Sequence, residues 1–174
     1  EERVLSAEHS ETRTFERKAV DLSGIIRSVL EKHTQRAHEL GLRFDIRLQQ
    51  QIAPVLADSK AISDAFEKLI DNAIKFGSNG EKIEVYLQDA GGPMVQITVR
   101  DFGIGIDPLE HQKIFQRFYQ VDGGATRRYP GTGLGLAMAK AIIEGHGGRI
   151  GVKSKLEEGA AFAFTIPKYD TLIQ

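Results

Sequence analysis

The chain has 174 residues, of which 41% are hydrophobic and 27% charged, a composition typical of one globular domain. Its 23 basic and 24 acidic residues leave a net charge of -1, which excludes a global field that would attract nucleic acid or an anionic membrane. The absence of cysteine excludes disulfides, thiolate metal sites and cysteine nucleophiles, and no apolar run approaches the roughly 20 residues that span a bilayer. We therefore expect a globular domain without nucleic-acid partners or direct membrane contact.

The N-terminal part of the chain predicts a connector followed by a helix. Residues 1–19 are charged and rich in hydroxyl groups, and the chain begins without an initiator Met, so we interpret them as a connector to a segment outside this chain. Apolar residues spaced by three and four predict a helix over residues 22–40. Asp21 or Ser23 can cap its start, and Gly41 ends it.

The middle of the chain alternates between strand and helix patterns. Residues 42–48 alternate as a half-buried strand does, and a short strand follows at 54–57. A second helix opens at Asp58 or Ser59 and ends near Gly77 with an apolar stripe along one side. Residues 82–88 and 94–100 then predict a hairpin across a Gly-Gly-Pro turn.

The C-terminal part predicts a further short helix, a long loop, a third main helix and a closing hairpin. Asp107 and Pro108 can start the short helix, which carries Ile114, Phe115 and Phe118. Residues 120–133 lack periodicity, and loops of that length are usually functional or disordered. The element order favours an α/β (α+β) two-layer sandwich with an antiparallel or mixed sheet.

One candidate site lies directly after the strand that ends at Arg100. Asp101 is followed by Gly103 and Gly105, with Ile106 next to them. A carboxylate beside residues without side chains lets a flat ligand reach the backbone while the carboxylate accepts a hydrogen bond from an amino group. The alternative is a tight turn with a capping aspartate.

A second glycine cluster precedes the third main helix. Backbone N–H groups at a helix N-terminus suit phosphate oxygens, although the loop can instead simply need glycines for positive φ angles. The spacing fits neither a dinucleotide-binding fingerprint nor a P-loop. The residues of this cluster are Gly131, Thr132, Gly133, Leu134 and Gly135.

A third constellation occupies one face of the second helix. Lys68, Asn72, Lys75 and Phe76 are spaced by three and four residues and therefore lie together. The Asn72 amide oxygen is a plausible ligand for magnesium, and Lys75 can meet phosphate as a point charge. The alternative is a solvated helix edge beside the core stripe.

Taken together, these motifs resemble the ATP-binding domain of sensor histidine kinases, a family grouped with gyrase B, the Hsp90 chaperones and MutL. The resemblance covers about residues 20–167, and we assign residues 20–168 to the catalytic domain and 169–174 to a C-terminal tail. The matching segments are VDLS (20–23), NAIKF (72–76), DFGIG (101–105), IFQRFYQ (114–120), GTGLGLAMAK (131–140) and HGGRI (146–150).

The resemblance implies a mixed, mainly antiparallel sheet covered on one face by three helices, with a mobile ATP lid over residues 116–133. It also implies ATP and Mg²⁺ as cofactors. Asp101 would accept the adenine amino group, and the glycines and Ile106 after it would let the base approach. Asn72 would bind magnesium, Lys75 would contact phosphate, and Phe76 would pack on adenine.

The second glycine cluster, residues 131–135, would surround the triphosphate, and Phe115 and Phe118 would anchor the base of the lid. Three arginines are candidates to neutralise the transferring phosphoryl group, although they can also serve only the solubility of the loop. They are Arg117, Arg127 and Arg128.

Two departures from the family pattern bear on activity. Position 68 is Lys, where kinases of this family often have Asn and gyrase-like ATPases have a Glu that activates water, so self-contained hydrolysis is less expected. Whether Lys68 holds phosphate or weakens metal binding is open.

The second departure is that no phosphoacceptor helix precedes the domain, and His9 does not match the acceptor motif. We expect His33, His38, His111 and His146 to be surface or capping groups.

The leading hypothesis is a cytoplasmic protein-histidine kinase domain, whether or not its full-length parent is anchored in a membrane. Its partners would be the dimerisation and phosphoacceptor domain of the same kinase, in a homodimeric parent, and the receiver domain of a response regulator. The alternatives are a degenerate nucleotide-binding signalling module, suggested by Lys68, and a gyrase-like ATPase module.

Overall fold

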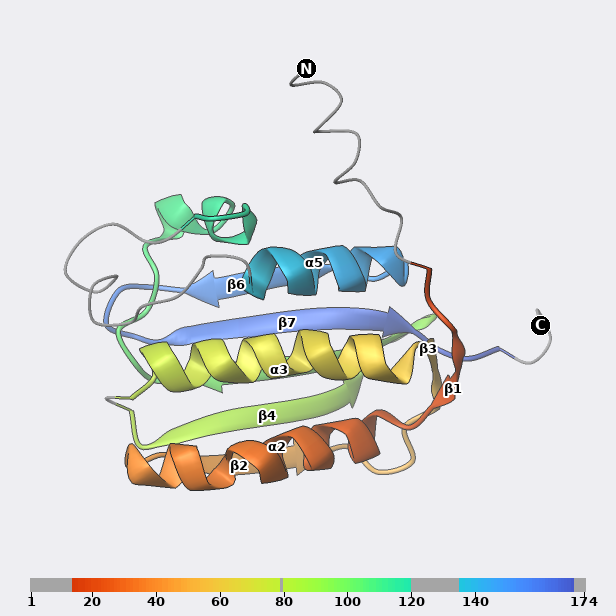
Figure 1. Ribbon diagram of the computed structural model, residues 1–174, viewed down its shortest axis with the longest axis horizontal. Coiled ribbons are helices and arrows are strands. Elements are labelled where there is room, and N and C mark those ends of the chain that lie inside the picture. The colour runs from red at the N-terminus through yellow and green to blue at the C-terminus, as the bar shows by residue number, and fades with distance from the viewer. Residues whose placement is uncertain (1–13, 79, 120–134, 171–174) are drawn as a thin grey trace, which may run out of the picture.

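The computed structural model describes residues 14–78, 80–119 and 135–170. In these ranges the chain forms two layers, a sheet and a layer of α-helices that covers one of its faces (Figure 1). The elements in chain order are β1 (Lys18–Val20), α2 (Leu22–Glu39), β2 (Arg43–Leu48), β3 (Val55–Ala57), α3 (Ser59–Phe76), β4 (Lys82–Asp89), β5 (Met94–Asp101), two 3₁₀ turns η1 (Pro108–Glu110) and η2 (Lys113–Phe115), α5 (Gly135–Gly145), β6 (Ile150–Ser154) and β7 (Ala160–Pro167).

The main sheet has five strands in the order β2-β4-β5-β7-β6. Strand β2 runs parallel to β4, and every other neighbouring pair is antiparallel. The predicted hairpins, β4 with β5 and β6 with β7, are therefore confirmed, and so is the predicted mixed, mainly antiparallel sheet. Strands β1 and β3 form a separate two-stranded sheet.

Capping side chains set the starts of the two long helices. Asp21 accepts a hydrogen bond from the Ser23 N–H at the start of α2, and Asp58 accepts one from the Ala61 N–H at the start of α3. Each carboxylate satisfies a backbone donor that the first helical turn leaves without a partner. The two aspartates, rather than the neighbouring serines, are thus the N-caps.

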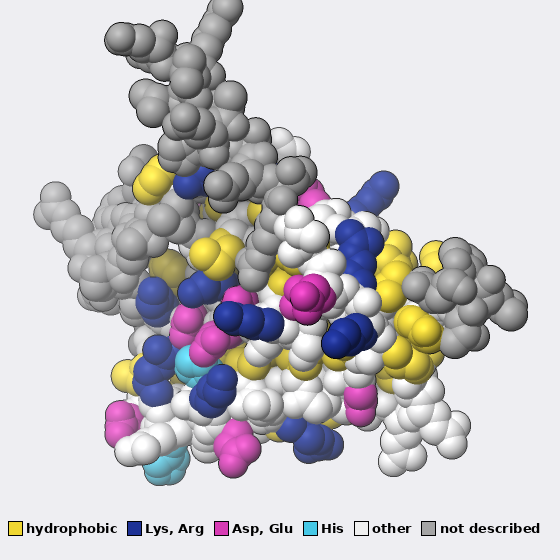
Figure 2. Space-filling view, turned by 45° about the vertical axis from the view of Figure 1, so that its right-hand side comes forward, with side chains coloured by type: hydrophobic (Ala, Val, Ile, Leu, Met, Phe, Trp, Pro, Cys, Tyr) yellow, Lys and Arg dark blue, Asp and Glu magenta, His cyan; other side chains and the backbone are white. Residues whose placement is uncertain are grey.

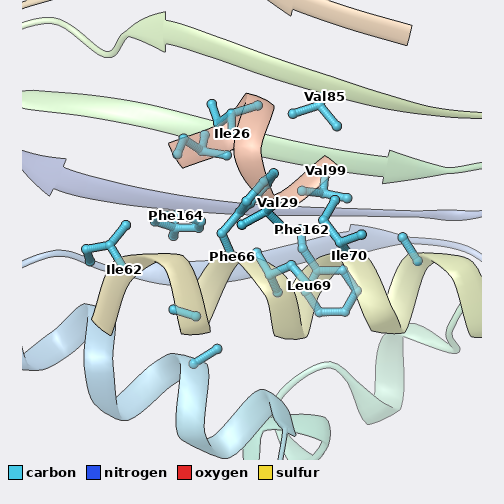
Figure 3. Packing of buried hydrophobic residues seen from close by; sticks show 14 of the residues in the cluster. Ile26, Val29, Ile62, Phe66, Leu69, Ile70, Val85, Val99, Phe162 and Phe164 are labelled. Atoms are coloured by element: carbon cyan, nitrogen blue, oxygen red, sulfur yellow. The ribbon is translucent and has the colours of Figure 1, made fainter. Parts of the chain in front are cut away.

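The core lies between the helices and the inner face of the sheet (Figure 3). The apolar stripe of α3 is buried along its length, and alternate residues of the strands meet it. Every second strand residue and the helix residues spaced by three and four point into the space between the layers, so their apolar side chains pack together there. Among the fully buried side chains are Ile26, Ile62, Phe66, Leu69, Ile70, Phe162 and Phe164.

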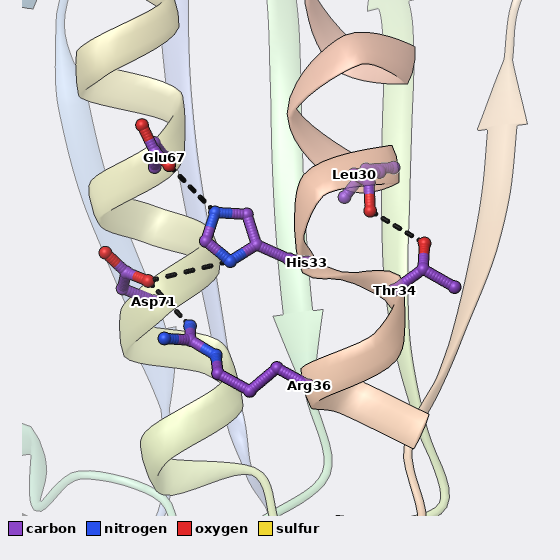
Figure 4. Close-up of polar contacts among 6 residues, drawn as sticks. All are labelled: Leu30, His33, Thr34, Arg36, Glu67 and Asp71. Carbon is purple, nitrogen blue, oxygen red and sulfur yellow. Dashed lines mark hydrogen bonds and ion pairs between the residues drawn. The ribbon is translucent and has the colours of Figure 1, made fainter. Parts of the chain in front are cut away.

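Polar side chains join α2 to α3 (Figure 4). The His33 Nε2 lies 2.9 Å from Glu67 Oε1, and its Nδ1 lies 3.9 Å from Asp71 Oδ1. Arg36 Nη2 donates to the same Asp71 oxygen at 2.6 Å. Because successive residues of a helix are rotated by about 100°, these contacts turn the next face of α3, which carries Lys68, away from α2.

The segment after β5 departs from the predicted short helix. Instead of one helix from Asp107, the chain makes the 3₁₀ turns η1 and η2. Asp107 does cap the first turn through the Leu109 N–H, but Gln116 is extended and Phe118 has a φ of 64°. A residue with positive φ cannot continue a right-handed helix, so the segment stays as short turns.

The folded part begins before residue 20. Lys18 and Ala19, which fall in the range expected to be a connector, pair with Ala57 and Leu56 as part of β1. Phe15 packs against the core cluster. Residues 15–20, which we call the N-terminal strap, therefore belong to the domain.

Charged side chains are mixed on the surface. On the face in Figure 2, Lys and Arg lie among Asp and Glu rather than in a patch of one sign. Such mixing gives little long-range field, in keeping with the net charge of -1. Within the described ranges, no helix has the length and apolar character needed to cross a membrane.

Candidate functional site

A buried carboxylate lies at the end of the central strand β5. Asp101 is 1% exposed, and its Oδ1 accepts a hydrogen bond of 3.0 Å from the Gly103 N–H. Burial raises the pKa of Asp101 to about 6, although hydrogen bonds from the backbone N–H groups of Gly103 and Ala160 oppose the rise. A carboxylate kept this dry interacts strongly with a hydrogen-bond donor brought to it.

The glycines around Asp101 let the end of α3 approach the strand. A Cβ on Gly103 would collide with the Phe76 carbonyl oxygen and lie 2.6 Å from the Gly77 Cα. A Cβ on Gly77 would lie 2.7 Å from the Asp101 Cβ. The Ile104 N–H donates to the Phe76 carbonyl at 3.2 Å. Glycine is needed at both positions because neither leaves room for a Cβ: Gly103 faces the backbone of α3, and Gly77 faces the Asp101 Cβ.

The turn between β6 and β7 supports the same loop from the other side. The Ile106 N–H donates to Ser154 Oγ at 2.8 Å, and the Glu157 N–H donates to the Ile104 carbonyl at 2.7 Å. Gly105 has a φ of 72°, and a Cβ there would collide with the Lys155 carbonyl oxygen. The loop after Asp101 is thus held in place on two sides.

The structure brings the C-terminal end of the predicted α3 face next to this loop. Phe76 is half-buried and ends the helix, while Lys75 in the last turn is exposed. Asn72 is half-buried, and its side chain has no hydrogen bond to any other described residue. A half-buried amide left in this way has an oxygen to offer to a ligand.

The side chain of Lys68, on α3, lies beside the start of α5. A Cβ built on Gly135, the first residue of α5, would lie 3.7 Å from the Lys68 Cδ. The apolar stem of Lys68 therefore runs past the N-terminus of α5, where backbone N–H groups have no partners within the helix. A helix N-terminus carries partial positive charge, so this is a place that suits an anion.

Of the two phenylalanines expected to anchor a lid, only one packs inside. Phe115 is half-buried, with its ring edge-on to Phe162 at a centroid distance of 6.1 Å. Phe118 is 68% exposed, and the Arg117 guanidinium lies 5.7 Å from its ring centroid. Six further predicted residues lie outside the described residues: Arg127, Arg128, Gly131, Thr132, Gly133 and Leu134.

A groove of about 500 Å³ lies elsewhere, between α2 and the edge strand β2. Its lining includes Leu30, Phe44, Ile46 and Arg43. None of the predicted site residues lines it. The groove is therefore separate from the cluster around Asp101.

Two of the histidines expected to be surface or capping groups lie inside, and one of them, His146, does act as a cap. His146 is 2% exposed, and the side chain of His33 is 12% exposed. The His146 Nε2 accepts a hydrogen bond from the Asp58 N–H, so its Nδ1 carries the proton and donates to the Ile142 carbonyl. Nothing in the sequence signals this burial, because the Asp58 N–H that bonds His146 and the Glu67 carboxylate that bonds His33 are distant in the chain.

Comparison with protein families gives a match over residues 57–170 to the family described as histidine kinase-, DNA gyrase B- and HSP90-like ATPase. The sensor histidine kinase AruS of Pseudomonas aeruginosa is 38% identical over 85% of this chain and 15% of its own length. The sensor protein kinase WalK of Staphylococcus epidermidis is 32% identical over 94% of this chain and 27% of its own length. The chain thus spans well under a third of these relatives.

Solved structures show the same fold. Full-length ShkA in complex with AMPPNP has a TM-score of 0.82 and 29% identity over 94% of this chain and 33% of that one. The histidine kinase ThkA in complex with the response regulator protein TrrA has a TM-score of 0.75 and 28% identity, over 97% of this chain and 46% of that one. The catalytic domain of ThkA alone has a TM-score of 0.76 and 29% identity, over 88% of this chain and 97% of that one.

Proposed function

The chain belongs to the histidine kinase-, DNA gyrase B- and HSP90-like ATPase family, and from this premise we propose that it is the ATP-binding catalytic domain of a sensor histidine kinase. The observation that carries the proposal is the buried Asp101, presented at the end of β5 beside Gly103 and the last turn of α3. The relatives named as sensor kinases, and a structural neighbour in complex with AMPPNP, support it.

In this proposal the adenine end of ATP lies against β5 and α3. The Asp101 carboxylate accepts the adenine amino group, and the face of Phe76 packs on the base. Gly103 and Gly105 leave the backbone bare on that side. The site should discriminate strongly between adenine and bases that lack the amino group, because such a base leaves the buried Asp101 carboxylate without a hydrogen-bond donor.

The phosphates lie between α3 and the start of α5. Lys75 and Lys68 supply positive charge, and the N-terminus of α5 supplies backbone N–H donors near Gly135. An imidazole nitrogen on a separate dimerisation domain attacks the γ-phosphorus and forms a nitrogen–phosphorus bond. The bond from the γ-phosphorus to the β,γ-bridging oxygen breaks, and ADP leaves with that oxygen. The domain then acts by positioning and charge neutralisation, without a covalent nucleophile of its own.

The residues present also fit a magnesium ion that is held mainly by the nucleotide. The described residues contain no group of three or more His, Cys, Asp or Glu side chains able to hold a metal by themselves. Asn72 offers a single amide oxygen, which suits an ion that takes its other ligands from phosphate and water. Bound with ATP, magnesium would neutralise phosphate charge.

Partners and location follow from the same proposal. The phosphoacceptor would be a dimerisation domain of the same kinase, and the phosphoryl group would pass on to a response regulator. A structural neighbour in complex with a response regulator supports this pairing. We place the domain on the cytoplasmic side of the cell.

The test is phosphoryl transfer to a supplied acceptor. The chain is incubated with γ-labelled ATP and magnesium, with and without the dimerisation domain of its own parent protein. An acid-labile phosphohistidine on the acceptor is expected. Nucleotide binding without transfer would favour the degenerate module that Lys68 suggests, and phosphate release by the chain alone would favour a gyrase-like ATPase.

Replacing Asn72 with Ala should remove the magnesium-dependent part of ATP affinity. A ligand lost directly should weaken metal-assisted binding by about 10- to 100-fold, the range seen even for groups one shell further out. Calorimetric titration with ATP, with and without magnesium, measures the difference. Asn72→Asp keeps a hard oxygen and should retain the metal effect. An equal magnesium effect in Asn72→Ala and in the original protein would refute the assignment.

A further inference from the structure

The N-terminal strap, residues 15–20, ties together the ends of two helices. The Arg17 Nη2 donates to the Gly145 carbonyl at the end of α5 at 2.6 Å. The Glu16 N–H donates to Asp58 Oδ2, at the start of α3, at 3.0 Å. Strand β1 of the strap also pairs with β3, which leads into α3. In Figure 1 the strap crosses the ends of both helices on one side of the molecule.

His146 is the central residue of this junction. It follows α5, and its Nε2 accepts from the Asp58 N–H at 3.1 Å, so one imidazole bonds the end of α5 to the cap of α3. Its Nδ1 and the Ile142 carbonyl are 2.8 Å apart. The Phe15 ring covers it at a centroid distance of 4.3 Å. The His146 imidazole is 2% exposed, so breaking its hydrogen bonds would leave buried polar groups without partners, which is unfavourable.

The candidate phosphate site lies at the opposite end of the same two helices. Helices α3 and α5 lie side by side and run in opposite directions (Figure 1). The strap therefore touches the start of α3 and the end of α5, while Asn72 and Gly135 lie toward the other ends. α5 is about 16 Å long, so a tilt of about 5° about the strap would move Gly135 by about 1.4 Å.

We propose that the side chains of Phe15, Arg17 and His146 are positioning groups that set the angle of α5 on α3 and thereby the phosphate-binding geometry at Gly135. The inference rests on the proposed function, since it concerns the triphosphate end of that site. The adenine end is built from β5, the loop after it and the end of α3, whereas the hydrogen bonds of Glu16 and Arg17 go to the start of α3 and the end of α5. Changes in the strap should therefore affect phosphate binding and leave adenine binding alone.

The test compares ATP with adenosine, which lacks the phosphates. Arg17→Ala and Phe15→Ala are titrated with each ligand at a temperature at which every variant is folded. ATP affinity should fall by about tenfold, the size of one lost hydrogen bond to a charged group, while adenosine affinity stays within about twofold. Arg17→Lys, which keeps a donor for the Gly145 carbonyl, should restore much of the ATP affinity.

Two controls separate positioning from stability. Lys18→Ala alters an exposed strap residue in β1 and should change neither affinity. Leu42→Ala removes a buried side chain near the opposite edge of the domain and should lower stability without changing the ratio of ATP to adenosine affinity. Equal losses for ATP and adenosine in Arg17→Ala and Phe15→Ala, or no loss for either, would overturn the inference. If the original protein binds neither ligand, the proposed function itself fails.

Discussion

Replacing Asp101 with Asn is expected to weaken ATP binding by about 10- to 100-fold and to abolish preference for ATP over GTP. The change removes the charge that accepts the adenine amino group, and a hydrogen bond to a charged group contributes about 1.5 to 3 kcal/mol. The Asn side-chain oxygen can still accept a hydrogen bond from the Gly103 N–H, so the turn at residues 101–103 should be retained. Calorimetric titration with ATP and GTP measures both effects.

The matched control for this change is Asp21→Asn. Asp21 caps α2, and Asn is an equally good cap, so neither the fold nor nucleotide affinity should change. ATP affinity of Asp101→Asn equal to that of the original protein would remove Asp101 from base recognition. Circular dichroism of both variants shows whether the fold is retained.

The second large effect is a pH dependence of stability that originates at Asp101. Burial raises the pKa of Asp101 from 3.8 to about 6 in the folded protein, so the folded state holds the proton more tightly than the unfolded chain. The stabilising contribution is therefore fully present below pH 3.8 and is lost as the pH rises through 6. At about 1.36 kcal/mol per pKa unit, the loss is about 3 kcal/mol.

Urea unfolding of the original protein and of Asp101→Asn across this pH range provides the measurement. The free energy of unfolding of the original protein minus that of the variant should fall by about 3 kcal/mol as the pH rises from below 4 to 7. The difference cancels the titration of all other groups. Parallel pH profiles for the two proteins would show that Asp101 does not titrate in this way.

The same titration should appear in ligand binding. Because the adenine amino group needs an acceptor, adenosine should bind more weakly as the pH falls through about 6. Adenosine is preferable to ATP here because it carries no phosphate that titrates in the same range. The stability of the empty protein and its affinity for the base thus respond to pH in opposite directions.

Much of the fold could be predicted from local patterns. The stripe of α3, the alternation in β4 and β5 and the capping by Asp21 and Asp58 depend on neighbours within a few residues, and the structure agrees with them. The segment after Asp107 could not be predicted as well. Its start carries a cap and a proline, but phenylalanine is not a residue type that predicts the positive φ found at Phe118.

The candidate site divides in the same way. Asp101, Gly103 and Asn72 could be named from motifs, because glycine and acceptor side chains at fixed spacing have a local meaning. The roles of Gly77, Ser154 and His146 could not be predicted from motifs. Gly77 approaches Asp101, Ser154 accepts from the Ile106 N–H, and His146 accepts from the Asp58 N–H, 88 residues away. Distant backbone partners leave no pattern in sequence.

The sequence by itself determined the type of site: a carboxylate and glycines for a base, an amide and lysines for phosphate and metal, and a set of ordered motifs shared with one family. Only the tertiary structure decided how those groups are held. It buried Asp101 enough to raise its pKa to about 6, and it tied residues 15–17 to the far ends of α3 and α5. The physical reason is that a motif is defined by residue types close together in the sequence. The burial of a side chain and the angle between two helices depend on contacts between segments that only folding brings together.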